Sequence, residues 1–124
     1  DLIACAGACA SGDEAHRRAA ISRAYYAAYH DSNAWATQHN VGPALTPTDK
    51  SGKPVQGMHA VFIAGLKQPS MALPRTLRLQ SSRRGIFLAI LHQKRIRADY
   101  DIGVEVPIED AFQAIQDAQQ VLAI

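Results

Sequence analysis

Apolar residues recur at spacings of three and four along most of this chain, and breaks rich in proline and glycine divide it into separate periodic segments. This spacing places the apolar residues on one face of an α-helix. No segment alternates like a β-strand over a useful length, because the one candidate, residues 102–106, is too short. The chain has 124 residues, 48% of them hydrophobic, which is enough for one buried core. The sequence therefore predicts a single all-α domain over residues 1–124, a four- to five-helix up-and-down bundle.

Four periodic segments are predicted to be helices, over residues 13–40, 57–67, 75–98 and 107–124, and residues 1–10 are interpreted as the remnant of a first helix. Ser11 and Asp13 are placed to cap the helix that starts at residue 13. Pro107 suits the first turn of the last helix. Residues 40–56, 68–74 and 99–106 are expected to connect the helices.

Each predicted helix has an expected inward face. In residues 13–40 this face contains Ile21, Ala24, Tyr25, Ala28 and Trp35. In residues 57–67 it contains Met58, Val61, Phe62 and Leu66. In residues 75–98 it contains Leu77, Leu79, Ile86, Phe87, Ile90 and Leu91, with Gly85 as a weak point of the helix. In the last helix it contains Ile108, Ala111, Phe112, Ile115, Ala118 and Leu122.

The charges are strongly segregated along the chain, although the net charge is only +2. Residues 50–98 hold ten lysines and arginines and no acid, whereas residues 99–124 hold six acids and no lysine or arginine. One interpretation is a basic surface that attracts phosphate-bearing ligands. The other is that the basic segment packs against the acidic last helix, so that the two neutralise each other within the fold.

The composition and motifs of the chain argue against several classes of protein. Two cysteines in this length do not make a disulfide scaffold, and a reduced, cytoplasmic protein is expected. Cys5 and Cys9 lie one helical turn apart with no further ligand nearby, so no metal is predicted. No cofactor is predicted either, because the chain has no glycine-rich phosphate loop or dinucleotide fingerprint. The apolar runs are too short for a membrane span.

Residues 21–30 carry the most specific local pattern, Ile-Ser-Arg-Ala-Tyr-Tyr-Ala-Ala-Tyr-His. Arg23 and His30 lie on the same side of the predicted helix, about 10.5 Å apart along its axis, with Tyr26 between them. A permanent cation, a phenol and an imidazole in one row suit a phosphate site. Equally, tyrosine and alanine at helical spacing are typical of core or interface packing, with Arg23 as a structural arginine.

A second pattern, His-Gln-Lys-Arg-Ile-Arg-Ala-Asp-Tyr-Asp at residues 92–101, marks the point where the basic segment ends and the acids begin. Arginines beside a histidine at a helix end can hold a phosphate diester. Alternatively the string is a polar lock, in which Arg97 pairs with Asp99 or Asp101 and Tyr100 docks into a neighbouring helix.

Together these motifs resemble the HEPN family. The ordered set is residues 22–30, then the histidine-bearing segment 58–62, then Arg97, Asp99 and Tyr100, and a last helix that begins Ile-Glu-Asp-Ala. It covers about residues 13–124 and is most similar to small stand-alone prokaryotic HEPN proteins with Tyr-Tyr-Ala and Ala-Asp-Tyr motifs. The resemblance implies a helical bundle that forms a homodimer and acts in toxin–antitoxin or phage-defence systems.

Many HEPN proteins are metal-independent endoribonucleases, in which an arginine and a histidine with four to six residues between them meet across a dimer. The resemblance implies that the 2′-hydroxyl of RNA attacks the adjacent phosphate, that the histidine moves the proton and that the arginine stabilises the charge. Arg23 and His30 have six residues between them and are the predicted catalytic pair. In the family this motif lies in the later helix, where Arg84 and His92 are separated by seven residues. The predicted RNA- or nucleotide-binding residues are Tyr26, Arg83, Arg84, His92, Arg95 and Arg97, with Asp99 and Tyr100 as structural residues.

The resemblance also allows a non-catalytic alternative. Small HEPN members without a clean motif accompany a minimal nucleotidyltransferase, and bind a nucleotide or that partner. The tyrosine- and alanine-rich face of residues 13–40 would then be the seam of a homodimer.

Overall fold

The chain folds into a bundle of α-helices. The computed structural model describes residues 2–10, 13–41, 48–101, 103 and 105–124. In these residues it contains α1 (Leu2–Ala10), α2 (Glu14–Gln38), α3 (Met58–Lys67), α4 (Arg75–Tyr100) and α5 (Ile108–Leu122), and no β-strand. The predicted all-α bundle is therefore confirmed. Over the same residues, each helix is too short or too polar to cross a membrane.

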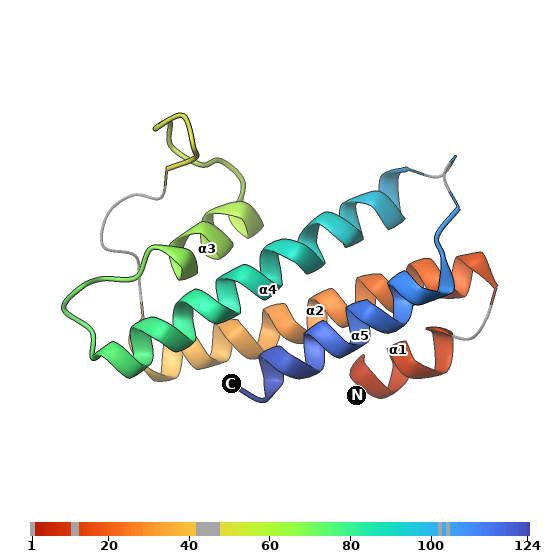
Figure 1. Cartoon of the computed structure of the whole chain (residues 1–124), viewed down its shortest axis with the longest axis horizontal. Coiled ribbons are helices and arrows are strands. Elements are labelled where there is room, and N and C mark those ends of the chain that lie inside the picture. The colour runs from red at the N-terminus through yellow and green to blue at the C-terminus, as the bar shows by residue number, and fades with distance from the viewer. Residues whose placement is uncertain (1, 11–12, 42–47, 102, 104) are drawn as a thin grey trace.

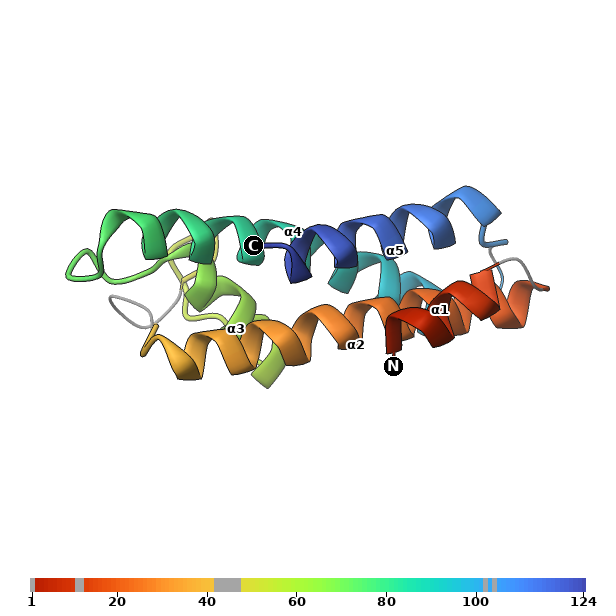
Figure 2. The same ribbon diagram turned by 90° about the horizontal axis from the view of Figure 1, so that it is seen from below.

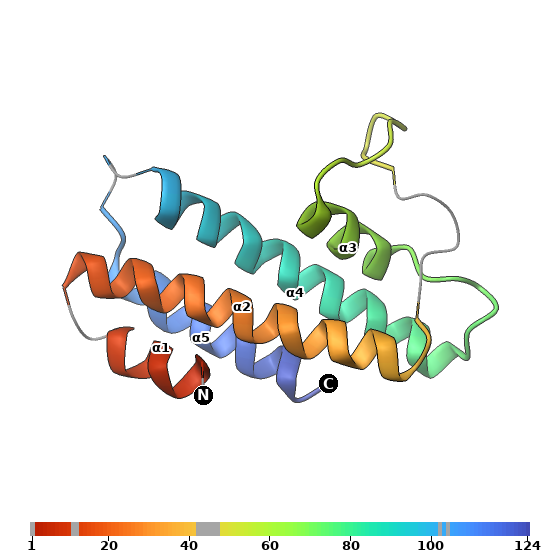
Figure 3. The same cartoon turned by 180° about the vertical axis from the view of Figure 1, so that it is seen from behind.

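Two long helices, α2 and α4, form the body of the bundle, with α5 packed beside both (Figure 1). Figure 2 shows α1 and α2 in one layer and α4 and α5 in the other. Viewed from the side of α2, α3 lies along one end of α4 (Figure 3). The backbone of α3 packs on α4, and α3 reaches α2 only through long side chains.

Helix α2 is as expected at its start and along its inward face. The Asp13 carboxylate accepts a hydrogen bond from the backbone N–H of His16, which caps the helix, while Ser11 lies outside the described residues. The predicted stripe is buried throughout: Ile21, Ala24, Tyr25, Ala28 and Trp35. Small alanines on this stripe leave room for α4 and α5 to approach closely.

The predicted inward face of α5 is partly wrong. Ala111, Ile115 and Ala118 are buried as predicted, whereas Ile108, Phe112 and Leu122 are exposed.

The predicted inward faces of α3 and α4 are also partly wrong. Met58 of α3 is 77% exposed, and the buried residues are Ile63, Gly65 and Leu66. Leu79 and Ile86 of α4 are 54% and 52% exposed. The buried face of α4 instead consists of Ser81, Arg84, Gly85, Leu88, Leu91 and Ala98. Two of these are polar, and both have partners on other segments, because Ser81 Oγ donates to the Leu66 carbonyl at 2.7 Å and Arg84 pairs with α2.

The far end of α4 is held by the first turns of α2. Arg18 donates hydrogen bonds to the carbonyls of Ala98 at 2.7 Å and Asp101 at 3.2 Å, which are among the last carbonyls of the helix. Arg17 donates to the carbonyl of Val106 at 2.9 Å, in the connector that follows. The connector is shorter than predicted because α4 runs on to Tyr100. Pro107 lies at the N-cap of α5, one position before the predicted first turn.

Gly85 marks the closest approach of α3 to α4. A methyl group at this position would lie 3.0 Å from the backbone nitrogen of Lys67 and 3.2 Å from Cβ of Leu66. Both distances are shorter than ordinary van der Waals contacts, so the glycine is a packing requirement rather than the weak point that its helix propensity predicts.

We predict opposite effects for two glycine-to-alanine substitutions. Gly85→Ala should lower the free energy of unfolding by about 1–3 kcal/mol, because α3 must move away from α4. Gly7→Ala should raise it by about 0.5–1 kcal/mol, since a methyl group there meets nothing within 4 Å and alanine is the better helix former. Urea unfolding followed by circular dichroism measures both. Equal effects of the two substitutions would contradict the close approach at Gly85.

Candidate functional site

Aromatic, histidine and arginine side chains from α2, α3 and α4 meet on one side of the bundle. We call this set the Tyr–His–Arg cluster, and its members are Tyr25, Tyr26, Tyr29, His59, His92 and Arg95. Tyr25 is fully buried, and the other five are partly exposed. The cluster fills the space between α2 and α3, where the Tyr29 and His59 rings stack with centroids 4.4 Å apart.

Tyr25 fixes the orientation of His59. Its hydroxyl lies 2.6 Å from Nδ1 of His59. Burial raises the pKa of Tyr25, so the phenol keeps its proton. A buried hydroxyl needs an acceptor, and Nδ1 of a neutral imidazole provides one. This arrangement leaves the proton of His59 on Nε2, away from Tyr25.

His59 and His92 form a parallel pair. Their ring centroids are 6.1 Å apart and their planes differ by 8°. Burial, followed by the charges of Arg95 and His30, lowers the pKa of His59. Burial, followed by His59 and Arg95, lowers the pKa of His92. Both imidazoles are therefore mainly neutral at pH 7. Nδ1 of His59 already accepts from Tyr25, so His92 is the better placed of the two to accept a proton.

Arg95 places a permanent positive charge beside the two histidines. Its guanidinium carbon lies 5.1 Å from the centre of the Tyr26 ring and 5.9 Å from that of Tyr25. Its Nε lies 3.0 Å from Oδ2 of Asp99, one turn further along α4. Asp99 thus holds the arginine that rests on the tyrosines of α2, which links the two sequence motifs.

The cluster has the groups that proton transfer next to an anion requires. A neutral imidazole can act as a general base, its protonated partner as a general acid, and a guanidinium can stabilise negative charge on a phosphate. Partly exposed aromatic rings on the same side, Tyr26 and Tyr29, offer faces for stacking a base.

The predicted catalytic pair does not converge within one chain. Arg23 is half-buried on α2 and His30 is exposed on the same helix. Seven helical residues separate them by about 10.5 Å along the axis, too far for both to contact one phosphate. His30 instead lies at the margin of the cluster, where its ring stacks on Tyr26 with centroids 6.0 Å apart.

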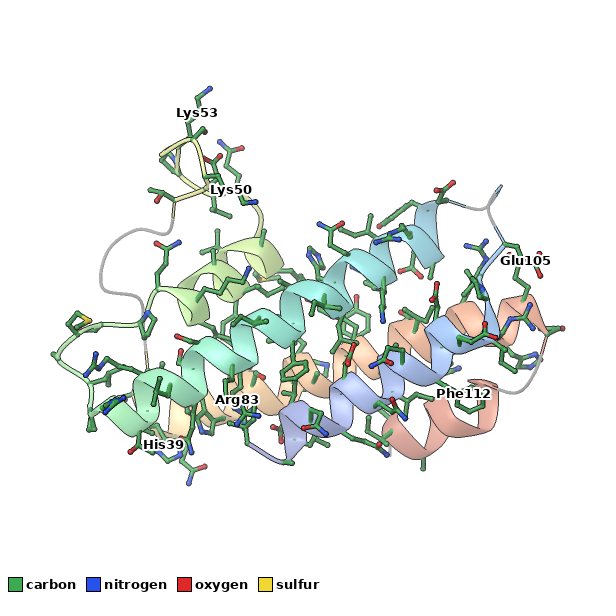
Figure 4. All side chains as sticks on the ribbon, viewed as in Figure 1. His39, Lys50, Lys53, Arg83, Glu105 and Phe112 are labelled. Carbon is green, nitrogen blue, oxygen red and sulfur yellow. The ribbon has the colours of Figure 1, made fainter. Side chains whose placement is uncertain are left out.

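The predicted binding residues fall on different sides of α4. His92 and Arg95 belong to the cluster, together with Tyr26 of α2. Arg83 and Arg97 are exposed and lie about 180° and 140° around the helix from His92. Figure 4 shows Arg83 on the side of α4 away from the turn that carries Lys50 and Lys53. One short RNA segment in the cluster would not reach these two arginines.

Arg84 is part of the core. Its side chain is 3% exposed, and its Nη1 lies 2.8 Å from Oδ2 of Asp31 and 3.1 Å from Oγ of Ser32. Its guanidinium also lies over the Trp35 ring, 4.9 Å from the centroid. Contacts on α2 occupy this arginine, so we assign it a structural role in place of the predicted ligand contact.

The polar lock at residues 97–101 has different partners from those predicted. Asp99 pairs with Arg95 and not with Arg97, which forms no ion pair with any described residue. Tyr100 does not dock into a neighbouring helix, because it is 73% exposed. The lock is completed by Arg18 of α2, which holds the carbonyls at this end of α4.

His59 and Tyr29 were not among the predicted site residues. The available signal was the spacing of His59 with Ile63 and Leu66, which puts the histidine on the same face as the two residues that α3 buries. The prediction chose the face of Met58 and Val61, which places His59 at its edge.

Ion pairs neutralise part of the basic segment inside the fold. Lys94 lies 3.6 Å from Asp117 of α5, Arg84 pairs with Asp31, and Arg95 pairs with Asp99. The remaining bases of residues 50–98 form no ion pair with any described residue. Of these pairs only Lys94–Asp117 involves the acidic last helix, so neutralisation by that helix is partial. Attraction of phosphate-bearing ligands stays a prediction.

The described residues bring no three histidine, cysteine or acidic side chains together as metal ligands. Cys5 is an exposed thiol, and the side chain of Cys9 lies outside the described part. Ala24, Tyr25 and Ala28 are fully buried within one chain, so these three residues are not available to a dimer seam. Tyr26 and Tyr29 on the same helix are partly exposed, and a seam through them stays a prediction.

No family model, curated protein or solved structure matches the chain.

We predict that two neighbouring arginines respond very differently to replacement by methionine. Arg84→Met should lower the free energy of unfolding by about 1–3 kcal/mol, because Ser32 and Asp31 lose a charged partner inside the bundle. Arg83→Met should change it by less than about 0.5 kcal/mol, since that side chain is exposed. Chemical denaturation of both variants measures the difference. An unaffected Arg84→Met protein would contradict the structural role.

Proposed function

We propose that this chain is a HEPN-type protein of a toxin–antitoxin or phage-defence system that binds single-stranded RNA at the Tyr–His–Arg cluster and cleaves it there. The family and its biological role rest on the order of the sequence motifs. The position of the RNA site rests on one observation, the parallel His59–His92 pair beside Arg95.

In this proposal His92 accepts the proton of a ribose 2′-hydroxyl, whose oxygen forms a bond to the adjacent phosphorus, because Tyr25 already occupies Nδ1 of His59. The bond from phosphorus to the 5′-oxygen breaks, and the second histidine, in its protonated form, gives that oxygen a proton. The products are a 2′,3′-cyclic phosphate and a 5′-hydroxyl. Arg95 stabilises the negative charge that grows on the phosphate, and Tyr26 and Tyr29 stack on the flanking bases.

We predict that cleavage depends on the cluster rather than on the pair Arg23 and His30. Purified protein is incubated with a single-stranded RNA, and the products are separated on a gel. His92→Gln and Arg95→Met should each reduce the cleavage rate by about 100-fold or more, because each removes a group that acts on the reacting phosphate. His39→Gln, at the far end of α2, should cleave like the wild type.

The double variant Arg23→Ala/His30→Ala separates the two assignments. If it loses all cleavage while His92→Gln keeps it, the catalytic pair is the one predicted from the sequence, and the cluster is structural. Circular dichroism of every variant shows that lost activity is not lost folding.

A second candidate is a non-catalytic helical module that pairs with a second copy or with a nucleotidyltransferase. The observation that favours it is an apolar stripe on the outer side of α4. Leu79, Ile86 and Ile90 lie on this stripe at helical spacing, and all three are exposed in one chain. The neighbouring Arg83 and Arg97 surround it with positive charge. An exposed stripe of this kind is typical of a protein interface.

We predict that Ile86→Asp abolishes self-association if the second candidate is correct. Light scattering should then give the mass of a dimer for the wild type and of a monomer for the variant, because a carboxylate replaces an apolar contact. Met58→Asp is the matched control, since Met58 is exposed on α3, away from the stripe. A monomeric wild type, or a dimer unaffected by Ile86→Asp, counts against pairing through α4.

A further inference from the structure

A groove of about 410 Å³ runs between α3 and α4 and is bounded by residues 48–55. Its floor is formed by small and aliphatic side chains, among them Ala60, Ala64 and Ala89. Its polar edge contains Lys50, Lys67 and His92. This volume lies within the range of about 300–1,000 Å³ that is usual for small-molecule sites.

The turn that bounds the groove has a defined conformation. Oδ1 of Asp49 accepts hydrogen bonds from the backbone N–H of Ser51 at 2.8 Å and of Lys53 at 3.1 Å, and from the Ser51 hydroxyl at 2.6 Å. Gln68 of the segment after α3 donates to the Thr48 carbonyl at 3.1 Å, which ties the turn to that helix. Lys53 lies at the tip of the turn, and Lys50 lies nearer to α3 (Figure 4).

The groove has an excess of positive charge. Asp49 is the only acid along it, and its carboxylate is occupied by the hydrogen bonds of its own turn, which lower its pKa. Lys50 and Lys67 form no ion pair with any described residue. The stem of Lys67 lies against Gly85, so its position over α4 is set by packing. Two permanent cations and one imidazole thus line one small groove.

His92 connects the groove to the Tyr–His–Arg cluster. One side of its ring faces the cluster, where it lies parallel to His59, and the residue also lines the groove. The charged and titratable groups around the two histidines are Tyr25, Tyr26, Tyr29 and His30 of α2, Lys67 of α3, Arg95 and Asp99 of α4, and Asp49 and Lys50 of the turn.

We propose that the groove between α3 and α4 binds a phosphomonoester, the terminal phosphate of an RNA or of a free nucleotide. Lys50, Lys67 and His92 surround the phosphate, and the alanine-lined floor holds the attached sugar and base. The inference deepens the proposed function and rests on it in one respect. The RNA whose terminal phosphate binds in the groove is the RNA proposed to bind the Tyr–His–Arg cluster, and its chain passes His92 between the two sites.

The charge of the groove favours a monoester over an internal diester. A diester has one negative charge, whereas a phosphomonoester has about 1.5–2 at pH 7, because its second pKa is near 6. Two lysines and a protonated His92, together with the ionised Asp49, give the groove two net positive charges, which match the larger charge. The alanines of the floor offer no hydrogen-bonding side chain to a base, whereas Thr48, Gln68 and Gln93 elsewhere in the lining do.

Binding of the phosphate is linked to pH. Without a ligand, burial, His59 and Arg95 keep the pKa of His92 low. A bound dianion favours the protonated imidazole and raises that pKa, so affinity should rise as the pH falls from 8 towards about 6. Below about pH 6 the phosphate itself takes up a proton, so the affinity should stop rising.

The test measures the affinity of short 2′-O-methyl oligonucleotides, which cannot be cleaved through a 2′-hydroxyl. One sequence is used with a 5′-phosphate, with a 3′-phosphate and with neither, and adenosine monophosphate is the separate nucleotide probe. We expect a terminal phosphate to tighten binding by about tenfold at pH 6.5, the effect of one added charge-assisted contact. The preference should disappear in Lys50→Ala, Lys67→Met and His92→Gln. Methionine keeps the stem that packs on Gly85.

Lys53→Ala is the matched control for Lys50→Ala, because both residues belong to the same turn and only Lys50 lines the groove. The control should keep the full preference. Equal affinity of the wild type for phosphorylated and unphosphorylated oligonucleotides overturns the inference. If the oligonucleotides bind with equal affinity and Arg95→Met abolishes that binding, the proposed RNA site in the Tyr–His–Arg cluster remains supported and only the phosphate site in the groove is wrong. If no oligonucleotide binds but adenosine monophosphate does, and the lysine variants abolish this, the groove stands and the proposed RNA function fails.

Discussion

The arrangement of α2, α3 and α4 depends on one buried phenol. Tyr25 is among the largest side chains that the bundle buries completely, and its hydroxyl bonds to Nδ1 of His59 at 2.6 Å. Because α3 has no backbone packing with α2, this hydrogen bond and the stack of Tyr29 on His59 are what join the two helices. The same contacts fix the histidine ring that the proposed chemistry needs, so packing and function share one set of atoms.

The basic segment serves four different purposes once the chain is folded. Arg84 and Lys94 connect α4 to α2 and α5, which places positive charge within the bundle. Arg95 is held by Asp99 over the tyrosines, where its charge adds to the effect of burial in lowering the pKa of both neighbouring histidines. Lys50 and Lys67 line a groove, and Arg83 and Arg97 surround an apolar stripe on the opposite side of α4. A single basic surface does not describe this distribution.

The sequence predicted the number and extent of the helices well because proline and glycine breaks and the three–four spacing are local properties. It failed in part for the inward faces of α3, α4 and α5, since these helices have apolar residues on more than one side. The buried side of α4 includes Ser81 and Arg84. The Ser81 hydroxyl is satisfied by the Leu66 carbonyl and Nη1 of Arg84 by Asp31 and Ser32, although Nε of Arg84 has no hydrogen-bond partner among the described residues. A hydrogen bond between segments far apart in the chain does not alter the spacing of apolar residues in the sequence, so that spacing cannot predict it.

The candidate site, too, could be predicted from the sequence only in part. Tyr26, His30, His92 and Arg95 were predicted from local patterns, and the fold brings them together from two helices. His59 was missed because its partner Tyr25 is 34 residues away, beyond any helical spacing. The resemblance also predicts a site completed by a second copy, whereas the cluster is assembled within one chain. A dimer through α4 would leave both histidines uncovered, because the apolar stripe lies on the other side of that helix. Self-association and RNA binding can therefore occur on the same molecule without competing for a surface.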